Sequence, residues 1–224
     1  MAGTDGKPVA LVTGAGRGIG RDIALGLTRA GFALCMVARN REDLLDTRRL
    51  SGLAPEDSLI ILLDLAQPEA PETLMTAAID HFGRIDALVN NAHFAPQASS
   101  LIELDPEGLD RAIALNLRAP IVLARLAAAM MAPRGGGTII NIVRGGSRTS
   151  SDHGSVYAAS CSGLLAFTRS AHAELRRQSI KLCAMVLAPG PESSPVVPEM
   201  VVRTALAPLD AAAVEIEVVE PEGS

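Results

Sequence analysis

The chain has 224 residues, a formal net charge of −5 and a hydrophobic content of 48%. This length suits one α/β domain with a sizeable core, which the scarcity of aromatic residues predicts to be built from Ala, Leu, Val and Ile. The negative net charge argues against a surface that binds nucleic acid. We expect no signal peptide and no apolar run that reaches membrane-spanning length, and therefore predict a cytoplasmic protein.

The three cysteines do not have the spacing of metal ligands. Cys35, Cys161 and Cys183 lie in apolar or helical runs that are far apart in the chain. Buried thiols in a reducing compartment are the simplest interpretation. The sequence therefore predicts no metal site.

A glycine-rich turn, residues 13–20, follows the first apolar run of the chain. The run at 9–12 is typical of a buried strand, and Ile19, Ile23 and Leu27 then recur every fourth position, as on one face of a helix. Glycine lets the backbone of such a turn approach a pyrophosphate, toward which the first amides of the helix point. The alternative is a turn that binds nothing. The order of strand, turn and helix instead predicts nucleotide binding.

Strand and helix patterns alternate along the chain that follows. Buried strands are expected at 32–38, 59–63, 85–89, 138–143 and 180–187, and helices at 41–50, 71–82, 105–131 and 156–177. Asp105 and Pro106 have the pattern of a helix cap and a first helical residue. This alternation predicts the α/β class, with a doubly wound parallel sheet of Rossmann type in a single domain over residues 1–224.

The pattern weakens in residues 190–224, which we expect to form a shortened and flexible C-terminal segment. Prolines at 191, 195, 198 and 208 interrupt it, so a loop is predicted at 192–198 and a helix over 201–206 at most. Val214, Ile216 and Val218 alternate with other residues, as in a half-exposed last strand. A disordered acidic end is an equal alternative.

Five short motifs follow the predicted elements in a fixed order. They are Thr13-Gly14-x-x-x-Gly18-x-Gly20, Asp64-Leu65, Asn90-Asn91-Ala92, Tyr157 and Pro189-Gly190. Together they resemble the short-chain dehydrogenase/reductase family over about the first 190 residues. The resemblance implies an oxidoreductase that uses a nicotinamide dinucleotide, acts on a small carbonyl compound or alcohol, and associates into homo-oligomers. An active paralogue is a further candidate partner.

The glycine turn, the positions of two arginines and the resemblance together predict a set of residues that contact the cofactor. They are Gly14, Arg17, Gly18, Ile19, Gly20, Arg39, Asp64, Leu65, Asn90, Ala92, Pro189 and Gly190. Family members usually have glycine where this chain has His93, a residue that either projects toward the nicotinamide region or faces solvent. Asp64 has an equal alternative role, capping the turn that follows it.

Charge predicts the choice of dinucleotide. An acidic residue at the end of the second strand would repel a 2′-phosphate, but Arg39 stands in that segment and Arg17 lies inside the glycine turn. Two guanidinium groups suit a doubly charged phosphate, so we predict NADP(H). The alternative is that both are ordinary solvated arginines.

The catalytic positions depart most from the family, whose members usually combine asparagine, serine, tyrosine and lysine. Asn116 matches the asparagine, with a purely structural role as its alternative. Tyr157 matches the tyrosine, which exchanges a proton with the substrate. Arg144 falls at the serine position and Cys161 at the lysine position. A missing cation about 4 Å from a phenolate removes about 4 kcal/mol at an effective dielectric near 20, and proton transfer is then slowed by about 10²- to 10³-fold.

Three functions remain open from the residues alone. An oxidoreductase with a modified site would need a substitute such as Arg144 for the cation, Ser147 or Ser151 for the hydroxyl, or His93 or His153 as proton donor. A nucleotide-binding pseudoenzyme would keep the glycine-rich turn but have no catalytic activity. A structural subunit would need neither the turn nor the activity. The two lysines of the chain, Lys7 and Lys181, are expected at the opposite end of the sheet from the site.

Overall fold

The computed structural model describes residues 6–96, 101–144, 154–187, 196–211 and 213–218, which include seven strands in one parallel sheet. The strands are β1 (Val9–Thr13), β2 (Ala33–Ala38), β3 (Ser58–Leu62), β4 (Ala87–Asn90), β5 (Gly137–Arg144), β6 (Ile180–Leu187) and β7 (Glu215–Val218). Their order is β3-β2-β1-β4-β5-β6-β7. The chain therefore winds outward in both directions from β1 and β4, and a crevice is expected at the carboxyl ends of these two strands.

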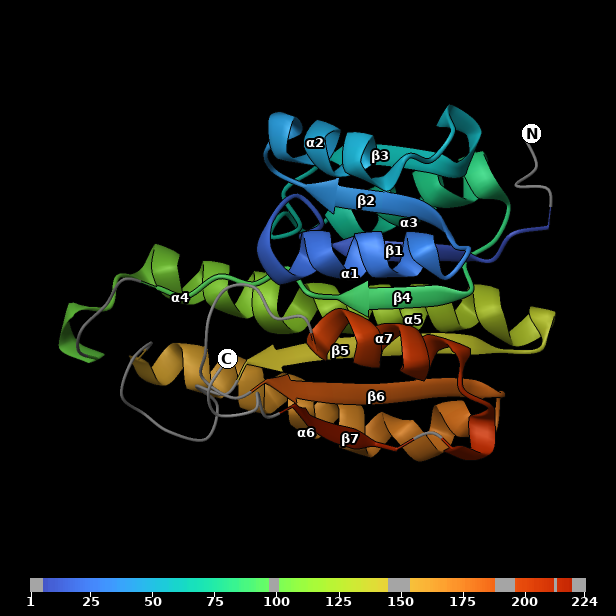
Figure 1. Cartoon of the computed structure of the whole chain (residues 1–224). Helices are drawn as coiled ribbons and strands as arrows, with labels where there is room; N and C mark the ends of the chain where they lie inside the picture. The colour runs from blue at the N-terminus through green and yellow to red at the C-terminus, as the bar shows by residue number, and fades with distance from the viewer. Residues whose placement is uncertain (1–5, 97–100, 145–153, 188–195, 212, 219–224) are drawn as a thin grey trace.

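Helices cover both faces of the sheet (Figure 1). One layer contains α1 (Gly18–Arg29), α2 (Arg41–Ser51) and α7 (Val196–Leu206), and the other contains α3 (Ala70–Phe82), α5 (Ala119–Met131) and α6 (Gly154–Arg176). Short 3₁₀ turns lie at 55–57, 101–103, 132–134 and 209–211. The expected doubly wound Rossmann-type fold is confirmed.

The core consists of two apolar layers that share the sheet. In β1, Val9 and Leu11 pack on the layer of α3 and α5, whereas Ala10 and Val12 pack on the layer of α1 and α7. All four are fully buried. A strand that is covered on both faces has a continuous apolar sequence rather than an alternating one, and this is why β1 could be predicted from residues 9–12.

The helix expected at 105–131 is continuous but contains one widened turn. Asp105 caps it by accepting a hydrogen bond from the amide of Gly108, α4 covers Pro106–Ile113, and a π-helical turn at Ala114–Arg118 leads into α5. The stretch Pro106–Arg134 is long and apolar enough to cross a membrane by length and composition alone, which corrects our expectation that no such run exists. In the fold, buried residues of α5 such as Leu123 and Met131 belong to the core against the sheet.

The C-terminal segment is more regular than its prolines suggested. The prediction of a loop through residue 198 was wrong for residues 196–198, because α7 begins at Val196 and extends to Leu206. Pro198 lies in the first turn, where an amide has no partner within the helix, so proline is tolerated there. Gly26 of α1 has no side chain to hold Pro198 and Val202 away, and α7 packs closely on α1. The last strand, β7, pairs with β6 from Glu215 to Val218, as one alternative expected.

Candidate dinucleotide and active site

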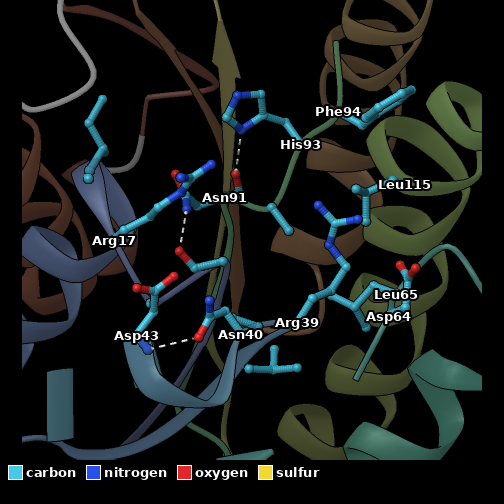
Figure 2. Close-up of a pocket in the computed structure, with 18 of the residues that line it drawn as sticks. Arg17, Arg39, Asn40, Asp43, Asp64, Leu65, Asn91, His93, Phe94 and Leu115 are labelled. Carbon is cyan, nitrogen blue, oxygen red and sulfur yellow. Dashed lines mark hydrogen bonds between the residues drawn. The ribbon is translucent and has the colours of Figure 1, made fainter. Parts of the chain in front are cut away.

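A cavity of about 720 Å³ lies at the carboxyl ends of the central strands. Its wall combines the glycine turn, the segments that follow β2, β3 and β4, and single residues from α2, from the π-helical turn and from the end of β5 (Figure 2). The lining residues are Gly14, 16–20, 37–40, Asp43, 63–65, 91–95, Leu115 and Arg144. Most of the cofactor residues expected from the sequence are therefore brought together here.

The glycines of the turn hold a backbone path that other residues would block. Gly14 and Gly18 have φ angles of +67° and +52°, in the left-handed region. A Cβ on Gly14 would lie 2.9 Å from the side-chain nitrogen of Asn91, and one on Gly20 would collide with the carbonyl oxygen of Gly14. The beginning of α1 is thus pressed against the end of β1, as a phosphate cradle requires.

Two side chains that sequence reasoning missed fix the carbonyl groups of this turn. The guanidinium of Arg21 donates to the carbonyl of Gly16, with its Nε at 2.9 Å. The hydroxyl of Thr47, fully buried on α2, lies 3.0 Å from the carbonyl oxygen of Ala15 and 3.2 Å from that of Gly16. These contacts hold the carbonyl groups of the turn against Arg21 and α2.

The first turn of α1 is suited to an anion. Arg17 precedes the helix without a side-chain capping bond, and the first turn contains no acidic residue. By contrast, Asn40 caps α2 by accepting hydrogen bonds from the amides of Glu42 and Asp43 at 2.8 and 3.1 Å. Amides at the start of a helix combine hydrogen-bond donors with the positive end of the helix dipole. The residues present therefore fit the diphosphate of a dinucleotide.

Arg17 and Arg39 stand on the wall of the cavity with exposed side chains (Figure 2). Arg17, inside the glycine turn, directly precedes α1, and Arg39 follows β2. Asp43, from the first turn of α2, also lines the cavity in this region, which the sequence did not indicate. The strand end itself presents Arg39 and Asn40 rather than a carboxylate.

Asp64 and Leu65 form another part of the wall. The carboxylate of Asp64 accepts a hydrogen bond from the amide of Ala66 at 3.1 Å and pairs with Arg111 of α4 at 2.8 Å. Burial acts to raise the pKa of Asp64, but these two partners and the charge of Arg39 outweigh it and hold the pKa below its usual value. The expected turn-capping role is present, and the contact with adenine stays a prediction.

The segment after β4 is tied to the glycine turn. The hydroxyl of Thr13 accepts from the amides of Asn91 and Ala92 at 2.9 and 3.0 Å. The side chain of Asn91 donates to the carbonyl of Thr13 at 3.0 Å. Ala92 and the exposed His93 line the cavity, and Nδ1 of His93 lies 3.4 Å from the carbonyl oxygen of Asn91.

Asn90 has a different position from its neighbours. It is buried and is not among the lining residues. Its side chain donates to Asn141 of β5 at 2.8 Å, and Asn141 donates to Thr168 of α6 at 2.9 Å. This buried series of amide and hydroxyl groups joins β4, β5 and α6 beneath the cavity.

Asn116 lies in the π-helical turn and holds two segments together. Its side-chain oxygen accepts from the amide of Phe94, and its nitrogen donates to the carbonyl of Phe94, both at 2.8 Å. The same nitrogen donates to the hydroxyl of Ser160 on α6 at 3.0 Å, and that hydroxyl donates to the carbonyl of Tyr157. Asn116 therefore positions both the cavity wall at Phe94 and the helix that carries Tyr157.

Tyr157 is buried in a cluster with Cys161 and residues of β5 and β6. Only 1% of Tyr157 is exposed, and it is not among the lining residues. Burial raises its pKa above the usual range, and the hydrogen-bonded Cys161 adds to this effect, whereas the positive charge of Arg144 opposes it. Burial also raises the pKa of Cys161, against hydrogen bonds from Tyr157, Ser160 and the backbone of Arg144.

Several expected residues lie elsewhere. Pro189, Gly190, Ser147, Ser151 and His153 fall outside the described residues. Lys7 pairs with Asp57 ahead of β1, and Lys181, near the start of β6, donates to the carbonyls of Thr204 and Ala205 in the last turn of α7 and of Ala207 just after it. Both lysines are thus at the amino ends of the strands, away from the cavity.

A doubly wound parallel sheet with a phosphate cradle beside β1 defines a dinucleotide-binding protein of the Rossmann type. Residues 8–201 match the model of the family described as short chain dehydrogenase. The chain belongs to the short-chain dehydrogenase/reductase family, as its motifs indicated.

Individual relatives and solved structures agree with this assignment. A short chain dehydrogenase/reductase, astE, of Aspergillus oryzae is 35% identical over 184 residues, which are 81% of this chain and 70% of that protein. An L-xylulose reductase of Mus musculus is 36% identical over 178 residues, 79% of this chain and 69% of that protein. A metagenomic short-chain oxidoreductase, solved in complex with NADP, has a TM-score of 0.85 at 31% identity and covers 94% of this chain and 96% of its own.

Proposed function

We propose that this chain is an NADP(H)-dependent oxidoreductase that acts on a small carbonyl compound or alcohol through an atypical active site. The observation that supports binding of NADP(H) is the uncapped first turn of α1, which begins at the glycine turn and lies in the same cavity as Arg17 and Arg39. The diphosphate would be held by the amides of this turn. A 2′-phosphate would be held by the two guanidinium groups, which form charge-assisted bonds with it.

The cofactor, when bound, supplies a hydride, so that the reaction balances as R₂C=O + NADPH + H⁺ → R₂CHOH + NADP⁺. The protein must then provide a proton to the carbonyl oxygen and stabilise the negative charge that develops there. We assign the proton to the hydroxyl of Tyr157. We assign the charge stabilisation to Arg144, which lines the cavity at the serine position and whose charge acts on Tyr157.

Further members of the expected cofactor set support the same site. Asp64 and Leu65 are proposed to face the adenine, and Ala92 to pass the ribose, since all three line the cavity. Asn116 acts as a positioning residue through Phe94 and Ser160. A cytoplasmic location and assembly with a second copy, or with an active paralogue, stay predictions.

A catalytically inactive nucleotide-binding protein, serving as regulator or partner subunit, is the second candidate. The observation in its favour is the burial of Tyr157, which raises the pKa of the phenol and keeps it off the cavity wall. Titration with NADPH followed by turnover of a panel of ketones and aldehydes separates the two. Binding with turnover supports the oxidoreductase, binding without turnover selects the second candidate, and no binding contradicts both.

The choice of dinucleotide is tested at Arg39. Removing one exposed guanidinium from a phosphate is expected to cost about 1.5–2 kcal/mol. Arg39→Ala should therefore raise the Kd for NADPH by about ten- to thirtyfold and leave the Kd for NADH unchanged, as measured by calorimetric titration. Arg41→Ala is the matched control, because Arg41 is exposed at the start of α2 but is not a lining residue. Equal binding of NADPH and NADH by the unaltered chain would contradict the prediction.

A further inference from the structure

Arg111 of α4 is not among the lining residues of the cavity, but it joins two segments that are. Its guanidinium pairs with the carboxylate of Asp64, which follows β3, at 2.8 Å. The same guanidinium lies over the ring of Phe94, in the segment after β4, with 5.5 Å from its central carbon to the ring centroid. In the sheet, β3 and β4 are separated by β2 and β1. Arg111 therefore ties together two parts of the wall that come from different regions of the sheet.

The position of Arg111 is fixed by its neighbours. The segment that carries Phe94 is held by Asn116, whose side chain accepts from the amide of Phe94 and donates to its carbonyl, both at 2.8 Å. Asn116 lies five residues after Arg111 on the same continuous helix. The pair with Asp64 is also partly buried, since the two side chains are 29% and 28% exposed. An arginine that is held in this way loses less side-chain entropy on pairing than an exposed one does.

A second arginine lies close enough to Asp64 to compete for it. The last residues of β2 and β3, Ala38 and Leu62, are partners in the register of the two strands. Arg39 and Asp64 follow these partners by one and two residues, and both line the cavity (Figure 2). The positive charge of Arg39 acts on Asp64, although Arg111 acts on it more strongly.

Asp64 is ionised at neutral pH, and yet it does not pair with Arg39. Burial acts against its charged form, but Arg111, the amide of Ala66 and the charge of Arg39 outweigh burial and hold the pKa of Asp64 below its usual value. Among the described residues, the exposed side chain of Arg39 has no hydrogen bond or ion pair. Of the two cations near this carboxylate, the one on α4 is engaged, and the one on the cavity wall is available to a ligand.

We infer that Arg111 is a positioning residue for the phosphate that distinguishes NADP(H) from NAD(H). By engaging Asp64, it leaves the guanidinium of Arg39 to the 2′-phosphate. Without Arg111, the carboxylate of Asp64 would take Arg39 as its partner, and its uncompensated charge would repel the phosphate. The inference rests on the proposed function, because it uses the same cavity and concerns how its cofactor is selected.

The test measures the ratio of the Kd for NADH to the Kd for NADPH by calorimetric titration of the full chain. A role of Arg111 that merely stabilises the wall would change both constants alike and leave this ratio unchanged. We expect Arg111→Met to lower the ratio by about three- to tenfold, because an exposed pair of Asp64 with Arg39 would be weak and would hold Arg39 only part of the time. Arg111→Lys, which keeps a charge beside Asp64, should retain most of the ratio.

Arg125→Met is the matched control. It removes the same charge and a similar ion pair, between α5 and Glu72 of α3, and neither residue lines the cavity. The ratio should therefore stay within about twofold of that of the unaltered chain. If Arg111→Met does not fold, Arg111→Gln, which keeps a donor but not the charge, takes its place in the same comparisons.

Two double variants show whether Arg111 acts through Asp64 and Arg39. Adding Asp64→Asn to Arg111→Met should restore the ratio to within about twofold of that of the unaltered chain, because the competing carboxylate is gone. In the Arg39→Ala background, Arg111→Met should lower the ratio by less than about twofold, because the guanidinium that Arg111 keeps available is absent.

Each other outcome contradicts the inference. It is overturned by an unchanged ratio in Arg111→Met, by an equal decrease in Arg125→Met, by a ratio that Asp64→Asn does not restore, or by a full decrease in the Arg39→Ala background. In these cases an unaltered chain that binds NADPH and reduces ketones leaves the proposed function intact. An unaltered chain that binds neither dinucleotide overturns the proposed function and the inference together.

Discussion

The close approach of α1 to β1 can be tested by adding a single methyl group. Gly20→Ala places a Cβ against the carbonyl oxygen of Gly14 and 2.5 Å from the side-chain nitrogen of Asn91. The first is a backbone atom, and the second belongs to a buried side chain that is held by hydrogen bonds to the carbonyls of Thr13 and Gly14, so α1 must move away from the turn. Overpacking of this kind costs about 1–3 kcal/mol, and alanine returns up to about 1 kcal/mol of helix propensity.

The free energy of unfolding should therefore fall by about 1–2 kcal/mol in Gly20→Ala, or by roughly 2–8 °C in Tm for a chain of this size. The Kd for NADPH should rise at least tenfold, since the displaced amides no longer meet the diphosphate. Gly26→Ala on the same helix is the control, because its Cβ would lie 3.3 Å from Pro198, where a small adjustment suffices. Urea unfolding and calorimetry measure both quantities. Wild-type stability and affinity in Gly20→Ala would refute the account of the cradle.

Two further predictions concern buried polar groups. Thr47→Val should lower the free energy of unfolding by about 1–2 kcal/mol and weaken NADPH binding, because it removes the single hydroxyl donor that lies within hydrogen-bond distance of the carbonyl oxygens of Ala15, Gly16 and Asp43. Urea unfolding and calorimetry check this, and unchanged affinity would contradict it. Burial raises the pKa of the Cys35 and Cys183 thiols to about 12. The stability that these neutral thiols contribute is therefore fully present below the thiol pKa of the unfolded chain, and it is lost as the pH rises from that pKa toward about 12. Urea unfolding between pH 8 and 11 should show that the free energy of unfolding falls with pH, and that in Cys35→Ala it falls by about 1.4 kcal/mol per pH unit less than in the unaltered chain.

The fold was predictable because its central strands, such as β1, β4 and β6, are buried on both faces. Short apolar runs such as 180–187 have the length of buried strands, and the helix capped by Asp105 begins at the expected residue. The misjudged element was α7. Its prolines argued locally against a helix, whereas the deciding contact, Gly26 against Pro198, joins residues that are far apart in the chain.

The site was predictable where backbone geometry demands a particular residue. The need for glycine at positions 14, 18 and 20 is steric, and it could be recognised from the sequence alone. Arg21 and Thr47 were missed because their partners are the carbonyl groups of a turn that only the fold brings to them. A signal did exist for Thr47, since it lies three residues after Leu44 and shares the buried face of α2 with it.

The environment of Tyr157 also bears on the direction of the proposed reaction. Oxidation of an alcohol needs a phenolate that can accept a proton, whereas reduction of a carbonyl needs a neutral phenol that can donate one. Because burial keeps the pKa of Tyr157 above that of an ordinary tyrosine, fewer than about one molecule in a thousand holds the phenolate at pH 7. Arg144 opposes this shift but does not overcome it, and Cys161 adds to it. The side chains around Tyr157 therefore hold the phenol in the protonated state that carbonyl reduction starts from, although as a weaker acid than an ordinary tyrosine, and alcohol oxidation by this chain should become measurable only as the pH is raised.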